Sequence, residues 1–159
     1  CVYRAICALE INHGSVNMDL LITNEGNVHI VDIGARMGGN LIGSHIIPTG
    51  TGIDYMGNMI RAAVGDTTNW EAEWQPIPIA TKLLALTPGK VKKLPNFDEI
   101  AMLYDVQIEH HIHVGDTITP YRTNLDGCGY VVARDLDVNL SIALAADVRK
   151  IIDESIVRE

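Results

Sequence analysis

Two aspartates in this sequence have the spacing of a paired acidic site. Asp19 and Asp32 lie in two segments that alternate apolar and polar residues, 16–23 and 28–35, joined by the sequence Asn-Glu-Gly-Asn at 24–27. Such alternation is typical of half-buried strands, and a short connection containing glycine is typical of a hairpin turn. With residues 25 and 26 at the tip of the turn, Asp19 is expected to lie directly across from Asp32.

The chemistry of this pair follows from its like charges. Residues paired across an antiparallel ladder have Cβ atoms roughly 4.5–5.5 Å apart on one face, so Asp19 and Asp32 would repel each other. Protonation, the cation of Arg36 or a divalent metal would relieve the repulsion. Mg2+ prefers carboxylate oxygens and keeps positions open for phosphate. The alternative is an exposed hairpin whose aspartates are merely solvated.

The other hairpin residues divide into two expected faces. The apolar face, predicted to pack on the core with Leu20 paired to Val31, carries Val16, Met18, Leu20, Ile22, Val31, Ile33 and Ala35. His29 is expected near the end of this face and is given no role. The acidic face also carries Leu21 and Ile30, which suit the flat apolar surface of an adenine ring better than bulk water.

Residues 14–40, GSVNMDLLITNEGNVHIVDIGARMGGN, resemble the carboxyl-terminal core of the ATP-grasp superfamily. In that family, two acids on paired strands are followed by a small residue or Asn, then by Arg and glycines. The chain is most similar to the L-amino-acid ligase-like and carbamoyl-phosphate synthase large-subunit-like members. The next segment, GIDYMGNMIRAAVGD, fits the same pattern, and the resemblance beyond residue 79 is weaker.

The resemblance implies roles for individual residues. Asp19 and Asp32 would hold Mg2+ (or Mn2+) on the β- and γ-phosphates of ATP, and Leu21 would pack on adenine. Arg36 would bind the transferred phosphoryl group or the substrate carboxylate, a task that suits a bidentate guanidinium.

The glycines that follow and two departures from the family pattern complete this expected site. Gly38 and Gly39 would offer backbone N–H groups close to an acyl phosphate, where a side chain would obstruct. Many family members have Glu at both acid positions, and many have Asn where this chain has Gly34. We expect Asn17, directly opposite Gly34 in the predicted register, to supply the missing ligand oxygen.

The elements that must position these residues form an expected α+β fold in two parts. Residues 1–77 are predicted to be the carboxyl-terminal part of an ATP-grasp domain, with an antiparallel sheet and packed helices. Residues 78–159 are predicted to be a small, β-rich carboxyl-terminal α/β subdomain. Besides the hairpin, helices are expected at residues 2–11, 53–64 (capped by a box at 51–54) and 139–156, and strands at 79–86, 106–113 and 130–133. Residues 38–52 are rich in glycine and show few periodic features.

Composition excludes some classes of function. The formal net charge of −8 argues against binding to a nucleic-acid backbone, which needs a basic surface. The apolar runs are far shorter than the roughly 20 residues of a membrane helix. Three widely spaced cysteines indicate a reducing, cytoplasmic location without a disulfide framework. Because the sequence starts within an amphipathic-helix pattern and has no initiator Met, we expect a fragment of a longer protein.

The histidines are weaker candidates. His111 and His113 would share one face of a strand that also contains His110, but no third metal ligand is evident, so a polar surface is expected. For His45, in the glycine-rich stretch, both a substrate contact and a hydrogen-bonded loop histidine remain open.

The expected function is that of an ATP-dependent carboxylate–amine ligase that activates a small carboxylate as an acyl phosphate. Its partners would be ATP, the carboxylate, the amine and the upstream domains of its own chain, which would carry the nucleotide-clamping lysines and the glycine-rich lid. A homodimer is left open, and the fragment alone is expected to be inactive. The alternatives are a regulatory or assembly module that kept the fold, and a relative of purine-biosynthesis, carbamoyl-phosphate or biotin-carboxylase enzymes.

Overall fold

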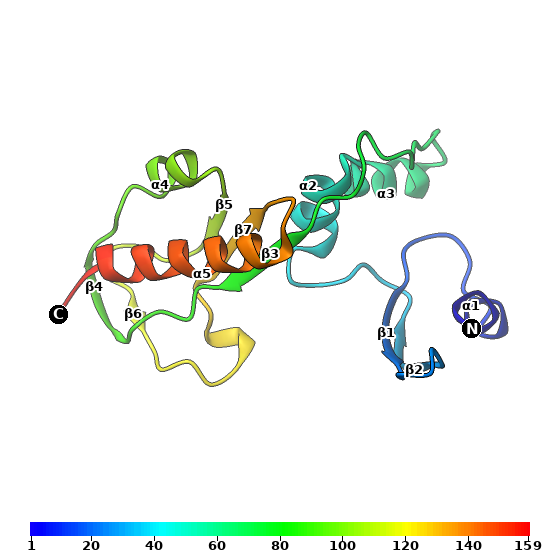
Figure 1. Ribbon diagram of the computed structural model, residues 1–159, viewed down its shortest axis with the longest axis horizontal. Coiled ribbons are helices and arrows are strands. Elements are labelled where there is room, and N and C mark those ends of the chain that lie inside the picture. Colours follow the sequence, from blue (N-terminus) through cyan, green and yellow to red (C-terminus); the bar gives the residue numbers. More distant parts are fainter. The chain divides into compact units, whose positions relative to one another are not determined.

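The computed structural model describes residues 1–159 and divides them into two compact units, Cys1–Gln75 and Pro76–Glu159 (Figure 1). The division falls in a segment without regular secondary structure, two residues before the predicted boundary. Both units mix helices with antiparallel strands, so the predicted α+β fold is confirmed. None of the helices is both long enough and apolar enough to cross a membrane.

The first unit contains one hairpin and four helical segments. In chain order these are α1 (Val2–Ala8), β1 (Asn17–Ile22), β2 (Val28–Gly34), the π-helix η1 (Ile42–Ile46), α2 (Ile47–Thr51) and α3 (Tyr55–Val64). The hairpin turn has Gly26 at φ 82°, a left-handed conformation that glycine adopts without steric cost. Two backbone hydrogen bonds close this turn, from Thr23 N to Asn27 O (2.9 Å) and from Gly26 N to Thr23 O (2.9 Å).

The hairpin register is correct in one half and shifted in the other. Asn17 pairs with Gly34 and Asp19 with Asp32, as predicted. Beyond this point the register shifts by one, and Leu20 pairs with Ile30. The predicted pairing of Leu20 with Val31 is therefore wrong: Val31 is the extra residue of a β-bulge and is 70% exposed.

The glycine-rich stretch is more regular than its sequence indicates, because η1 and α2 together occupy all of residues 42–51. The predicted capping box at residues 51–54 is wrong. Thr51 ends α2 and its hydroxyl donates to Ile47 O (2.7 Å). Asp54 is the N-cap of α3 instead, accepting a hydrogen bond from Gly57 N (2.9 Å).

The segment after α3 is fastened to that helix by polar and aromatic contacts. Asn58, only 1% exposed, accepts a hydrogen bond from Asn69 N (3.1 Å) and donates to Asn69 O. Trp70 packs edge-on against Tyr55, with ring centroids 5.7 Å apart. No hydrophobic side chain of the first unit is fully buried, so the predicted packing of the hairpin's apolar face on a core is not observed.

The second unit has two three-stranded antiparallel sheets, ordered β3-β7-β5 and β6-β4-β8. Its elements are β3 (Ile79–Leu83), β4 (Gly89–Lys93), α4 (Phe97–Tyr104), β5 (Gln107–His110), β6 (Thr117–Ile118), the 3-10 helix η2 (Asn124–Asp126), β7 (Gly129–Arg134), α5 (Val138–Ser155) and β8 (Val157–Arg158). Strands β3, β5 and β7 and helix α5 lie close to their predicted positions. The short strands β4, β6 and β8 and the helix α4 were not predicted from the sequence.

A hydrophobic core organises the second unit. Helix α5 packs on β3 and β7 (Figure 1). The most deeply buried apolar side chains are Leu84, Val91, Val131, Val132, Val148 and Ile152. Burial of each is worth roughly 1.5–3 kcal/mol relative to exposure, so this core dominates the stability of the unit.

A polar junction holds the carboxyl-terminal end of the second unit. Asp153, on α5, accepts hydrogen bonds from Thr87 N (2.9 Å) and Thr87 Oγ1 (2.8 Å). It also forms an ion pair with Arg158 in which both side chains are at least four-fifths buried. This junction ties the end of α5 both to the segment before β4 and to β8.

Candidate functional site

The paired aspartates are the centre of the candidate site in the first unit. Asp19 and Asp32 are direct cross-strand partners, so their carboxylates project from one face of the hairpin. Both residues are exposed to solvent. Their pairing depends on the β-bulge as well as on the turn, because the register next to the turn, with Leu21 opposite His29, would otherwise place Asp19 across from Val31.

The bulge at Val31 changes what surrounds the acids. Ile30, predicted on the acidic face, pairs with Leu20 and is half-buried on the opposite face. Leu21 remains on the acidic face at 59% exposure, and its cross-strand partner is His29. The prediction that His29 lies on the core face is therefore wrong.

A signal of this shift is present in the sequence. Within β2 the apolar residues Val28 and Ile30 follow one phase, and Val31 and Ile33 follow the other. Two adjacent apolar residues in an otherwise alternating strand mark the position where the phase changes, which is the position of the bulge.

Arg36 lies beside the same face. A Cβ atom added to Gly34 would lie 3.4 Å from Arg36 Cγ, so the stem of the arginine passes over this glycine. The guanidinium donates a hydrogen bond to Met37 O (2.9 Å), and Arg36 remains exposed. The side chain can therefore be redirected toward an anion at the cost of one hydrogen bond.

Asn17 and Gly38 approach each other closely. A Cβ atom on Gly38 would lie 2.9 Å from Asn17 Oδ1 and 2.9 Å from Ile42 Cδ1. Only glycine fits at residue 38 without a shift of its neighbours. Gly39 is exposed, and an added Cβ there would meet nothing within 4 Å. Asn17 lies opposite Gly34 as predicted, with its amide oxygen turned to Gly38.

A pocket of about 200 Å³ adjoins the two glycines. It is lined by Met37, Gly38, Gly39, Asn40, Leu41, Gly43, Ser44 and Met56. Asn40 and Leu41 have φ values of 52° and 65°, and Leu41 leads directly into the π-helix η1. Left-handed non-glycine residues and π-helical turns are both enriched at functional sites. His45 does not line the pocket, but its Nδ1 is hydrogen-bonded to Oγ of Ser44, which does (2.8 Å).

The oxygen donors on the hairpin suit Mg2+ that is also bound by phosphate and water, and not a metal whose ligands all come from the protein. No three His, Cys, Asp or Glu side chains come together anywhere in the chain as a metal-binding group. Asp19 and Asp32 provide two carboxylates, and Mg2+ typically takes one or two carboxylates with phosphate and water completing its shell. The donor set therefore fits a metal that arrives with a nucleotide.

The histidines at residues 110–113 and the one buried cysteine lie in the second unit. His110 stacks on Phe97, with ring centroids 3.8 Å apart. His113 Nδ1 lies 3.6 Å from Asp116 Oδ2. Cys128 is buried, and this burial raises the pKa of its thiol.

Comparison with known proteins defines the class of fold. The chain aligns over 99% of its length with phosphoribosylglycinamide synthetase from Anaerococcus prevotii (TM-score 0.78, 18% identity) and with L-amino acid ligase from Bacillus licheniformis (TM-score 0.75, 21% identity). It also aligns over 99% of its length with the biotin carboxylase domain of 2-oxoglutarate carboxylase from Hydrogenobacter thermophilus, solved with MgADP and bicarbonate (TM-score 0.64, 15% identity). The chain covers 40%, 41% and 34% of these proteins, respectively. The fold is that of the carboxyl-terminal part of ATP-grasp ligases.

The sequence adds a more particular relationship. Residues 82–154 match the family model described as L-amino acid ligase C-terminal domain 2. No curated protein matches the chain. The recognition of an ATP-grasp ligase of the amino-acid ligase type, made from the sequence, is thus confirmed for the fold and for the second unit.

Proposed function

We propose that this chain is part of an ATP-dependent carboxylate–amine ligase and that its hairpin holds Mg2+ and ATP. The observation that carries the proposal is the direct pairing of Asp19 with Asp32 on an exposed face. Two opposed carboxylates are costly without a cation, and a metal bound to the phosphates of a nucleotide would neutralise both.

The proposed mechanism uses the chain mainly for positioning and charge stabilisation, as elsewhere in phosphoryl transfer. A substrate carboxylate oxygen attacks the γ-phosphorus of ATP, and ADP leaves. An amine then displaces phosphate from the acyl phosphate, and an amide-type bond remains. Arg36 would neutralise the transferred group, and the backbone at Gly39 would donate to it.

The second unit supports the choice of an amine-ligating parent. Its match to the amino-acid ligase model favours carboxylate–amine ligation over the purine-biosynthesis, carbamoyl-phosphate and biotin-carboxylase alternatives. The substrate pair remains a proposal, because one fold serves all of these reactions.

The exposed apolar residues of the first unit support a larger parent. Leu20, Ile22 and Val28 lie on the hairpin at 41%, 66% and 36% exposure. The chain also spans about 40% of the length of the first two ligases it resembles. We propose that upstream domains cover these side chains and supply the remaining nucleotide contacts, and that the fragment alone is inactive.

A non-catalytic module is the second candidate, favoured by one observation. Gly34 supplies no ligand at a position where many ATP-grasp proteins have Asn, and no third acidic side chain joins the pair. A regulatory or assembly protein derived from a ligase would tolerate these changes. It would keep the fold and bind the nucleotide poorly.

Calorimetric titration of this chain with ADP in the presence of Mg2+ tests the proposal. We expect Asp32→Ala to lower the affinity about tenfold or more, because it removes a metal ligand. Asp66→Ala is the control, since Asp66 is exposed and lies beyond α3. Equal heats of binding for wild type and Asp32→Ala would reject the metal platform. In the full-length protein, ADP release that depends on both a carboxylate and an amine distinguishes the ligase from the module.

A further inference from the structure

We infer that His29 contacts the base of the bound nucleotide, opposite Leu21, and so extends the base-binding surface from β1 onto β2. The inference rests on the proposed function, because it assumes that the acid pair holds the phosphates through a metal. The alternation of the sequence assigns His29 to the apolar face of the hairpin, opposite the acids.

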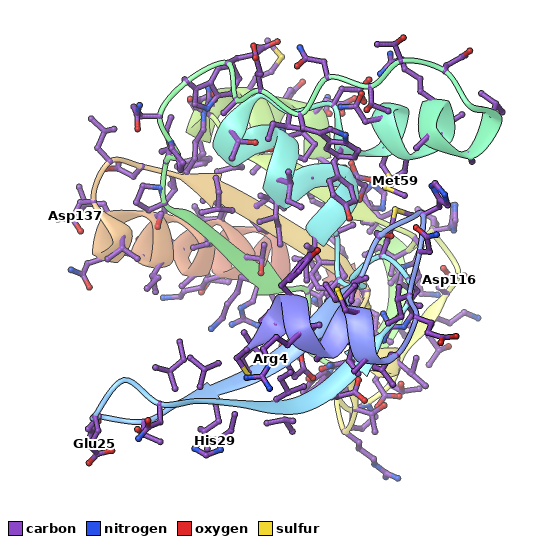
Figure 2. All side chains as sticks on the ribbon, turned by 90° about the vertical axis from the view of Figure 1, so that its right-hand side faces the viewer. Arg4, Glu25, His29, Met59, Asp116 and Asp137 are labelled. Atoms are coloured by element: carbon purple, nitrogen blue, oxygen red, sulfur yellow. The ribbon has the colours of Figure 1, made fainter.

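The shifted register places His29 on the same face of the hairpin as Leu21. Leu21 and His29 are cross-strand partners, so their side chains lie on the same face with Cβ atoms roughly 4.5–5.5 Å apart. Both residues are exposed. Figure 2 shows His29 projecting from the hairpin on the side away from helix α1 and the labelled Arg4. In the register predicted from the sequence, Ile30 would stand in this place.

Leu21 and His29 lie at a short distance from the acid pair along the hairpin. Leu21 follows Asp19 by two residues on β1, which corresponds to roughly 7 Å along the strand. This spacing is comparable to the separation between the phosphates and the base of a nucleotide. With the metal at the acid pair and Arg36 at the other end of the hairpin, the base is directed toward the turn. The Leu21–His29 pair is the next pair on that face.

The side chains of Leu21 and His29 offer a base different kinds of contact. Leu21 offers apolar area but no hydrogen bond. An imidazole has a flat ring that stacks on a base and two ring nitrogens that donate or accept at its edge. Together they form a surface that recognises a heteroaromatic ring, whereas two aliphatic residues would recognise only its apolar area.

The test separates the base from the phosphates. The affinities of this chain for MgADP and for magnesium pyrophosphate, which has no base, are measured by calorimetry. We expect His29→Ala to weaken MgADP binding by about three- to tenfold and to leave pyrophosphate binding unchanged. Asp32→Ala should weaken both ligands. His13→Asn is the matched control, because His13 is an exposed histidine of the same unit and Asn tolerates its φ of 54°.

A spectroscopic readout accompanies the affinities. In a histidine-labelled sample, the imidazole signals of His29, assigned by comparison with His29→Gln, should shift on addition of MgADP and not of magnesium pyrophosphate. If Asp32→Ala impairs both ligands but His29→Ala binds MgADP like wild type, the inference fails and the proposed function stands. If wild type does not bind MgADP, or Asp32→Ala binds it equally well, the proposed function fails and the inference fails with it.

Discussion

Asp19 and Asp32 form the last regular cross-strand pair of the hairpin before the β-bulge at Val31. A bulge bends its strand and re-aims the side chains that follow, and bulges are frequent next to active sites. Here the bulge brings the two acids opposite each other, while His29, and not the predicted Ile30, lies on their face. The bulge therefore determines both the acid pair and the side chains beside it.

Asp32→Asn should stabilise the first unit in the absence of metal. The substitution removes a like-charge pair while keeping the shape of the side chain, so we expect a gain of roughly 0.2–1 kcal/mol in the free energy of unfolding at low salt. The gain should shrink as salt screens the exposed charges. Both tryptophans, Trp70 and Trp74, lie in the first unit, so denaturant titration followed by tryptophan fluorescence reports on it. A loss of stability at low salt would show that the two carboxylates do not repel.

Gly34→Asn should strengthen magnesium binding. The new Cβ would lie 3.4 Å from Arg36 Cγ, an ordinary contact that requires little rearrangement. An amide oxygen added beside the acids could coordinate the metal. It should therefore raise the affinity for Mg2+ with ADP about tenfold. Asn17→Ala should weaken binding more in wild type than in Gly34→Asn if Asn17 supplies a ligand now. Equal effects in the two backgrounds would remove Asn17 from the metal site.

Asp153→Ala should destabilise the second unit strongly. It would leave Arg158 without its partner and remove both hydrogen bonds from Thr87, so we expect a loss of about 2–4 kcal/mol. Glu154→Ala is the matched control, because its pair with Lys150 is long (3.8 Å) and exposed and is worth about 0.5 kcal/mol or less. Urea denaturation followed by amide signals of the second unit gives both values. Similar losses in the two variants would contradict the structural role of the junction.

The thiol of Cys128 should make the second unit less stable at alkaline pH. Burial raises the pKa of Cys128, and Asp116 and Asp153 add to this effect while Arg158 opposes it. The unfolded chain therefore releases the thiol proton at lower pH than the folded chain. The resulting stability is complete below the ordinary thiol pKa and is lost as pH rises through the folded pKa.

The alkaline effect can be measured with a matched variant. Unfolding free energies recorded from pH 7 to pH 10 should fall more steeply for wild type than for Cys128→Ala. Alkylation offers a second measurement: the exposed Cys1 and Cys7 should react quickly in the folded chain, and Cys128 only on unfolding. Parallel pH profiles for the two proteins would contradict the prediction.

Much of the site could be predicted from local sequence. The alternation around Asp19 and Asp32 and the connection containing Gly26 predict a hairpin with both acids on one face, since both signals act between residues close in the chain. The predicted turn with only residues 25 and 26 at its tip is wrong, because Thr23 N bonds Asn27 O, and the bulge at Val31 restores the pairing of the acids. The long helix α5 was also predictable, because its apolar residues repeat at helical spacing over many turns. Elements missed in the second unit are short: β4 and β8 form only through pairs such as Val91 with Arg158, far apart in sequence.

The sequence by itself determined that Asp19 and Asp32 lie on adjacent strands of one hairpin, because a period of two and a short connection act between residues close in the chain. Only the tertiary structure decided which side chain accompanies them. A shift of one residue moves every following side chain to the other face, and the choice between His29 and Ile30 depends on which of them gains more by leaving water. Ile30 does, so it is half-buried and His29 is exposed beside Leu21.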